Sequence, residues 1–186
     1  MSRRGALLAL IMAAAAAGAH AADWTMDPAE SRLEFVATFE RTAAPGVFRT
    51  FDARMRFDPD RPEAGAIDVT IDVTSADMNS ADVNREIRKP EWFDFAGHPR
   101  AGFRAAEVRR TGANRYLARG TLRLKGVAQP VDVPFAWTGT ADAATMEGEL
   151  TVGRSDFGIG TGEWARTDVI GAEVKLRFKL RLRRAG

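Results

Sequence analysis

The sequence predicts an all-β fold, with about eight antiparallel strands in a barrel or a sandwich and one short helical insertion. Three observations predict it: apolar and polar residues alternate along most of the chain, turn-forming segments separate the alternating stretches, and one stretch breaks the alternation. Alternation indicates strands with one buried face and one face in water. Parallel strands covered on both sides would show continuous apolar runs instead. The pattern therefore favours an antiparallel sheet.

Residues 1–21 are predicted to be a signal peptide, which leaves residues 22–186 as a single domain. Two arginines precede an apolar run from Leu7 to Ala17, and the closing "AHA" offers small residues at the two cleavage positions. The run is shorter than the roughly 20 residues that span a bilayer. We therefore expect the mature chain to begin at Ala22, outside the cytoplasm.

Charge and cysteine content exclude several classes of function. The chain has 27 Lys and Arg against 25 Asp and Glu, and removal of Arg3 and Arg4 with the signal peptide leaves 25 of each. Proteins that bind nucleic acid usually carry a basic excess, so no nucleic-acid partner is predicted. The chain has no cysteine, which excludes thiol catalysis and cysteine-based zinc sites.

Eight stretches follow the opening of the mature chain with apolar residues on one face of an expected strand. In order, these faces run over Leu33 to Phe39, Phe51 to Phe57, Ile67 to Val73, Phe103 to Ala105, Tyr116 to Leu124, Val131 to Trp137, Met146 to Val152 and Val174 to Leu182. The segments "AAPG", "DPDRPEAG", "RTGAN", "KGVAQP" and "TADAA" are rich in turn-forming residues, and we expect them to separate the strands.

The stretch "SADVNREIRKPEWFDF" breaks the alternation and predicts a short helix that begins near Ser80. Pro90 either ends this helix or opens a second turn that carries Trp92 and Phe93. Such an insertion between strands has two interpretations: it plugs the core, or it forms a lid whose aromatic side chains face a ligand.

The motifs do not require an enzyme or a metal. A "DFG" triplet at Asp156 lacks every other element of a kinase. In "GIGTGEW", Glu163 stands where a dinucleotide fingerprint needs its third glycine, so we expect these glycines to give a long loop its backbone freedom. His98 is the single histidine of the mature chain, and the acidic residues are scattered. An enzyme for a small apolar substrate, using Arg154, Asp156 and His98, stays an alternative, as does a ligand-free interaction protein.

The last predicted strand reads "VKLRFKLRLRR", in which five basic residues alternate with apolar ones. The basic row has two interpretations. It is the solvated outer face of a closing strand, partly paired with Glu34 and Glu40 of the first strand, where each exposed pair contributes about 0–1 kcal/mol. Alternatively, it docks transiently on an anionic membrane surface.

Five motifs in order resemble the YceI-like family of bacterial periplasmic polyisoprenoid-binding proteins. They cover essentially the whole mature chain: "WTMD" from Trp24 with Ser31 and Phe35, "GVFRTF" from Gly46, "PEWFDFAGHPRAGF" from Pro90, "GTLRLKGV" from Gly120 and "RSDFGIG" from Arg154. The resemblance implies an eight-stranded, antiparallel, lipocalin-like barrel with a short helical insertion, located in the periplasm.

The resemblance also implies a binding or carrier protein without catalytic residues. Family members hold an isoprenoid chain, of a polyprenyl phosphate or a quinone, in an elongated apolar cavity, and no other cofactor is expected. The oligomeric state stays open. The residues expected to line the cavity are apolar residues of the strand faces and the insertion: Phe35, Phe51, Phe57, Val69, Ile71, Trp92, Phe93, Phe103, Phe135, Trp137 and Phe178.

Overall fold

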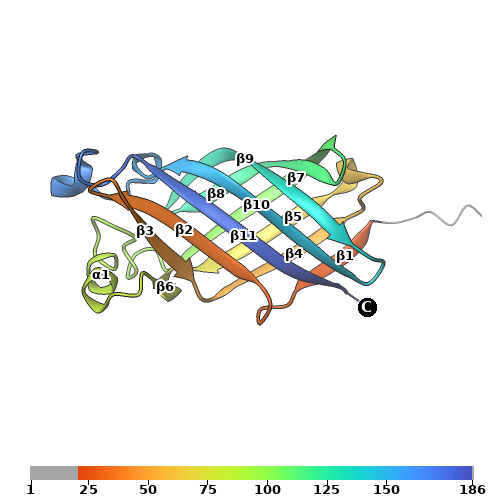
Figure 1. Cartoon of the computed structure of the whole chain (residues 1–186), viewed down its shortest axis with the longest axis horizontal. Helices are drawn as coiled ribbons and strands as arrows, with labels where there is room; N and C mark the ends of the chain where they lie inside the picture. Colours follow the sequence, from red (N-terminus) through yellow and green to blue (C-terminus); the bar gives the residue numbers. More distant parts are fainter. Residues whose placement is uncertain (1–20, 186) are drawn as a thin grey trace, which may run out of the picture.

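The computed structural model describes residues 21–185, which form a long antiparallel barrel (Figure 1). The predicted signal peptide lies outside these residues, apart from Ala21, and stays a prediction. None of the helices in the described range is long and apolar enough to cross a membrane.

The described residues form eleven strands, one α-helix and four short 3-10 helices. The strands are β1 (Ala22–Met26), β2 (Arg32–Phe39), β3 (Thr42–Phe48), β4 (Phe51–Phe57), β5 (Ala66–Asp72), β6 (Ala76–Asp77), β7 (Arg100–Gly112), β8 (Arg115–Leu124), β9 (Val127–Gly139), β10 (Ala143–Gly153) and β11 (Glu173–Arg184). The helices are α1 (Ala81–Glu86), η1 (Pro62–Ala64), η2 (Val73–Ser75), η3 (Ser155–Phe157) and η4 (Gly162–Ala165).

Eight strands close the barrel, as the sequence predicted. Their order is β1-β4-β5-β7-β8-β9-β10-β11, and β11 pairs with β1 to complete the ring. Every pairing is antiparallel. Closure matters physically because it pairs the edge strands that an open sheet would expose.

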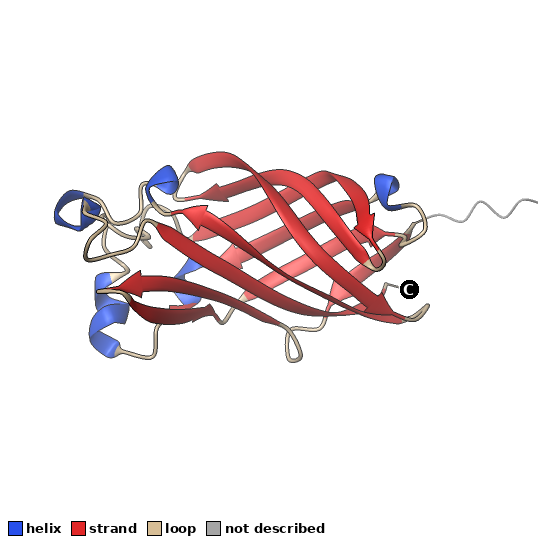
Figure 2. Cartoon of the chain, turned by 45° about the horizontal axis from the view of Figure 1, so that its top comes forward, coloured by secondary structure: helices blue, strands red, loops and turns tan. Residues whose placement is uncertain are grey.

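Three strands of the ring, β1, β4 and β5, do not run the full length of the barrel. Beyond their ends the wall is formed by β2, β3 and β6. β2 continues along β11, with Phe35 opposite Leu176, and β3 pairs with β2 and β6. Figure 1 shows β6 and α1 at one end of the barrel and the carboxyl terminus at the other. Figure 2 shows other helical segments gathered at that same end, which we call the mouth end; the opposite end is the tail end.

One predicted turn is wrong. The segment "AAPG" lies inside β3, and the turn falls two residues earlier, at Glu40 and Arg41, whose φ angles are 46° and 66°. Proline is tolerated there because β3 at Pro45 pairs only with β2, so the missing N–H would have faced away from the sheet.

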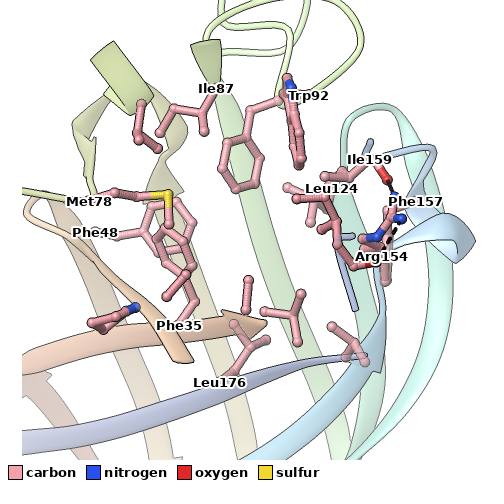
Figure 3. Close-up of a pocket in the computed structure, with 18 of the residues that line it drawn as sticks. Phe35, Phe48, Met78, Ile87, Trp92, Leu124, Arg154, Phe157, Ile159 and Leu176 are labelled. Carbon is pink, nitrogen blue, oxygen red and sulfur yellow. Dashed lines mark hydrogen bonds between the residues drawn. The ribbon is translucent and has the colours of Figure 1, made fainter. Parts of the chain in front are cut away.

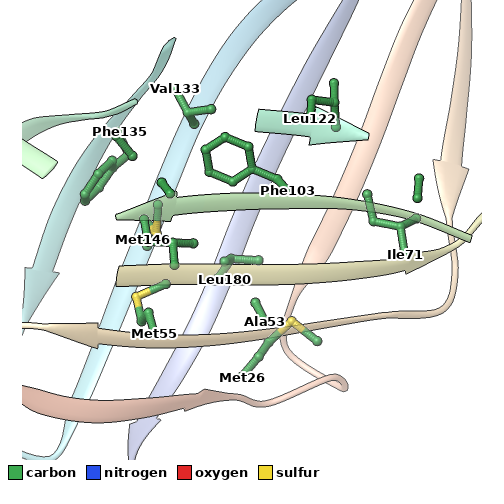
Figure 4. Close-up of a cluster of buried hydrophobic side chains, with 14 of the residues drawn as sticks. Met26, Ala53, Met55, Ile71, Phe103, Leu122, Val133, Phe135, Met146 and Leu180 are labelled. Carbon is green, nitrogen blue, oxygen red and sulfur yellow. The ribbon is translucent and has the colours of Figure 1, made fainter. Parts of the chain in front are cut away.

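The tail half of the barrel is packed with aromatic and aliphatic side chains. Phe57 has ring-centroid distances of 5.0 Å to Tyr116, 5.7 Å to Phe135 and 4.7 Å to Trp137. Figure 4 labels Met55, Met146 and Leu180, which belong to this core and come from three different strands. Alternation along each strand directs these residues inward, which is why the sequence pattern located them.

The predicted helix is confirmed. It spans Ala81–Glu86, and the hydroxyl of Ser80 accepts a hydrogen bond of 3.4 Å from the Val83 backbone N–H at its amino end. Serine is favoured at this position because its oxygen satisfies a backbone donor that the helix leaves free.

Candidate ligand cavity

The mouth end contains a cavity of about 520 Å³. This volume lies within the range of about 300–1,000 Å³ that is typical of small-molecule sites. Figure 3 shows apolar side chains converging on it from both walls of the barrel and from the insertion above. The few polar residues of the lining are Thr38, Asn79, Glu86 and Arg154.

The strand pattern explains how the wall of the cavity is built. Residues two apart on a strand point to the same side. β2 thus contributes Leu33 and Phe35, and β11 contributes Val174 and Leu176. The same spacing that marked these residues as an inward face in the sequence places them around one cavity.

The structure brings four of the predicted residues together at the cavity and places the other seven elsewhere. The four in the lining are Phe35, Ile71, Trp92 and Phe93. Those outside the lining are Phe51, Phe57, Val69, Phe103, Phe135, Trp137 and Phe178, which all belong to the hydrophobic core or pack against it. Which of the eleven contact a ligand stays a prediction.

The insertion both packs and lines the cavity. We call residues 80–99 the lid. Phe93 is buried, with ring-centroid distances of 6.0 Å to Phe35 and to Phe48. Trp92 also lines the cavity, and its Nε1 is buried without a hydrogen-bond partner among the described residues. Figure 3 draws that nitrogen on the lid side of the ring, so Trp92 presents mainly a carbon edge to the cavity.

A second segment, the mouth loop (residues 154–172), holds the lid in place. The backbone N–H groups of Gly160 and Thr161 donate to the Glu91 carbonyl, at 2.7 and 3.0 Å. Lys125 Nζ donates to the carbonyls of Pro90 on the lid and Gly158 on the mouth loop, at 2.5 and 2.6 Å. Burial lowers the pKa of Lys125. The lid and the mouth loop are thus joined by backbone and side-chain bonds.

Arg154 organises the mouth loop from within. Its side chain is only 3% exposed, and desolvation by burial lowers the pKa of its guanidinium. All of its hydrogen bonds among the described residues go to backbone carbonyls, those of Ile159, Gly160, Trp164, Ala165, Arg166, Ile170 and Gly171. An arginine has five N–H donors, and these carbonyls can engage all of them. The sequence pointed to Arg154 but not to this role.

Gly160 shows why the mouth loop needs glycine, as the sequence predicted. Its φ angle is 70°, and a Cβ at this position would lie 2.2 Å from Arg154 Nη1. The positive φ and the close approach of the guanidinium both exclude an ordinary side chain.

The three polar residues of the enzyme alternative are not hydrogen bonded to one another in the described range. The Arg154 donors face carbonyls, Asp156 is exposed, and His98 Nε2 lies 3.8 Å from Asp94 Oδ2. Arg154 lines the cavity, whereas Asp156 and His98 are outside its lining.

The basic row of β11 lies on the outer wall and pairs with acidic residues other than the predicted Glu34 and Glu40. Glu34 is opposite Arg177 in register, as expected, but Arg177 and Lys175 both contact Glu149 of β10, at 2.7 and 2.9 Å. These two cations lower the pKa of Glu149 through their hydrogen bonds. Further pairs join Arg181 to Glu30 and Arg183 to Asp27.

Comparison with known proteins adds sequence relatives. A sequence profile described as "YceI-like domain" matches residues 24–182. A UPF0312 protein of Pectobacterium carotovorum is 32% identical over 164 residues, which cover 83% of this chain and 85% of that protein. A UPF0312 protein of Azotobacter vinelandii is 33% identical over 120 residues, so the match spans 61% of this chain and only 62% of that relative.

Solved structures share the fold. BcnA of Burkholderia cenocepacia is 33% identical, with a TM-score of 0.82 over 84% of this chain and 98% of that one. A protein of Saccharophagus degradans, described as a polyisoprenoid binding domain implicated in plant cell wall breakdown, is 18% identical, with a TM-score of 0.71 over 89% and 99% of the two chains.

Proposed function

The chain belongs to the YceI-like family, and on this premise we propose that it is a periplasmic binding or carrier protein that sequesters an isoprenoid lipid. The observation that carries the proposal is the cavity of about 520 Å³, closed below by a packed core and lined almost entirely by apolar side chains. The description of the S. degradans domain as polyisoprenoid binding supports the same class of ligand.

The cavity would hold the lipid by removing its hydrocarbon from water. Burial of apolar surface is worth about 25 cal/mol per Å², with no directional contact needed. An isoprenoid, which carries apolar surface along its whole length, suits a cavity whose walls offer few polar partners. The head of the lipid, whether a polyprenyl phosphate or a quinone, would lie near the lid and the mouth loop.

Arg154 is not placed to hold a phosphate directly. Its N–H donors are engaged by carbonyls of the mouth loop, and it is the one cationic residue in the lining. A charged head would therefore remain at the mouth, in water, while the tail enters the barrel. This follows from the high cost of burying an ion without partners.

We also propose that the protein contacts the membrane surface transiently through the rim of the cavity. Phe39 of β2 and Val83 of α1 are 46% and 39% exposed, and both line the cavity at its mouth. Exposed cations stand near them in sequence, at Arg41 and Arg88. Large apolar side chains in water at the rim suit contact with a lipid surface.

Lipid extraction tests the proposed function. Protein purified from its native host without detergent is extracted with organic solvent and analysed by mass spectrometry, and we expect an isoprenoid lipid in about equimolar amount. The matched control is Leu176→Trp, which fills the cavity with a larger side chain and should leave the extract empty. The proposal fails if the wild-type extract contains no isoprenoid, or if Leu176→Trp retains as much of it.

A further inference from the structure

The cavity ends at a definite depth inside the barrel. On β11, Val174 and Leu176 line it, whereas Phe178, the next inward residue, lies outside the lining. On β7, at the opposite side of the ring, Ala101 lines the cavity and Phe103 does not. The lining thus ends just before a phenylalanine on both walls.

Each of these two rings lies against a glycine of the neighbouring strand. Gly148 of β10 is directly opposite Phe178, and a Cβ on Gly148 would lie 2.6 Å from Phe178 Cζ. A Cβ on Gly120 of β8 would lie 2.6 Å from Phe103 Cε2. A glycine allows an aromatic side chain to approach the neighbouring backbone closely.

The position of Phe103 between cavity and core is visible in Figure 4. Its ring lies between Leu122 and Ile71, which line the cavity, and Phe135 and Met146, which belong to the packed half. Phe103 is 8% exposed. We call Phe103 and Phe178, which border the inner end of the lining on their strands, the floor.

We propose that the floor determines which length of isoprenoid chain the protein prefers, an inference that rests on the proposed function. Each floor residue stands two positions after a lining residue on its own strand, on the same face. A smaller side chain in place of either phenylalanine would leave the volume of its ring empty, and this volume would extend the cavity. A longer chain could then bury additional methylene groups, each worth about fourfold in affinity.

The test compares chain-length preference in variants of the floor and of the core. The probes are geraniol, farnesol and geranylgeraniol, and the dissociation constants of delipidated protein are measured by displacement of a fluorescent lipid. The variants are Phe178→Leu and Phe103→Leu. The matched control is Phe57→Leu, which makes the same change in the aromatic cluster with Tyr116 and Trp137, away from the cavity.

We expect the preference for geranylgeraniol over farnesol to rise at least about tenfold in the floor variants and to stay unchanged in the control. If wild-type protein binds none of the probes, the proposed function itself fails. If it binds them but the floor variants keep its preference, or the control shifts equally, the floor inference is wrong and the proposed function stands. A variant without native near-ultraviolet circular dichroism is replaced by Phe178→Met or Phe103→Met, which remove the ring with less loss of volume.

Discussion

Lys125 Nζ lies 2.6 Å from the carbonyl oxygen of Gly158, so a side chain from the turn between β8 and β9 ties down the mouth loop. The same ammonium donates to Pro90 of the lid, at 2.5 Å. One residue therefore fastens both segments that cover the cavity.

Removal of this tie should loosen the lid. In Lys125→Met the carbonyls of Pro90 and Gly158 lose a charged donor, and hydrogen bonds to charged groups are worth about 1.5–3 kcal/mol. We expect the lid amides to exchange hydrogen at least about tenfold faster, measured by mass spectrometry. Lys179→Met, on the outer face of β11, is the control and should leave lid exchange unchanged. Equal exchange in both variants would show that backbone bonds alone hold the lid.

Replacement of Arg154 should destabilise the whole protein. In Arg154→Lys, three donors replace five, and several buried carbonyls of the mouth loop lose their partner. Each such loss costs about 1–3 kcal/mol, so we expect the free energy of unfolding in urea to fall by at least about 2 kcal/mol. Arg166→Lys is the control, because Arg166 is exposed and pairs with Asp168. A loss below about 1 kcal/mol would contradict the role of Arg154.

Acid should weaken the connection between β6 and the lid. Hydrogen bonds from Asn84, then from Arg49 and the Asn79 backbone, lower the pKa of Asp77 from 3.8 to about 2. The folded state thus gains stability above pH 3.8 from the ionised carboxylate and loses it as the pH falls toward 2. We expect Asp77→Asn to show a shallower loss of stability over that window in thermal unfolding. Identical slopes for wild type and variant would exclude Asp77 as the titrating group.

The pair of Phe35 and Gly46 should behave as a coupled unit. A Cβ on Gly46 would lie 2.3 Å from Phe35 Cζ, and its three nearest atoms all belong to that ring. Gly46→Ala should therefore push the ring into the cavity and weaken farnesol binding about tenfold. Adding Phe35→Leu should restore binding, because the smaller side chain leaves space for the methyl group. A double variant that binds no better than Gly46→Ala would contradict this coupling.

Membrane contact should depend on the rim of the cavity and not on the basic row. The row is paired along the outer wall with Glu149, Glu30 and Asp27. We expect the double variant Phe39→Ser, Val83→Ser to sediment with phosphatidylglycerol vesicles about fivefold less or lower still. Each substitution removes an apolar side chain that would be buried in the lipid. Reversal of charge at Arg177 and Arg181 to Glu should leave sedimentation unchanged. If charge reversal reduced sedimentation and the rim substitutions did not, the membrane contact would be assigned to β11.

Much of the fold could be predicted because local patterns carry it. Period-two alternation marked the inward faces of strands such as β2 and β11, and both lie around the cavity. Ser80 marked the start of α1 through its capping chemistry. The turn before β3 was misplaced because proline is a turn signal in isolation, and only its edge position in the sheet makes it acceptable within a strand.

The candidate site was harder to predict because alternation identifies inward-facing residues but does not distinguish a cavity from a packed core. Phe35 and Phe135 have the same apolar, alternating context, yet Phe35 lines the cavity and Phe135 is buried in the tail half. The roles of Lys125 and Arg154 could not be predicted either. Their partners are backbone carbonyls, which every residue has, so no residue type marks them in the sequence.

The sequence by itself determined that this protein is an antiparallel β structure, because strand faces, turns and caps follow from residues close together in the chain, and its motifs identified a family whose barrel is closed. Only the tertiary structure decided where the interior is open, because the space in front of a side chain depends on residues from several strands far apart in sequence. The floor is an example, because Phe103 and Phe178 lie against glycines of neighbouring strands, Gly120 and Gly148, at the inner end of the cavity lining.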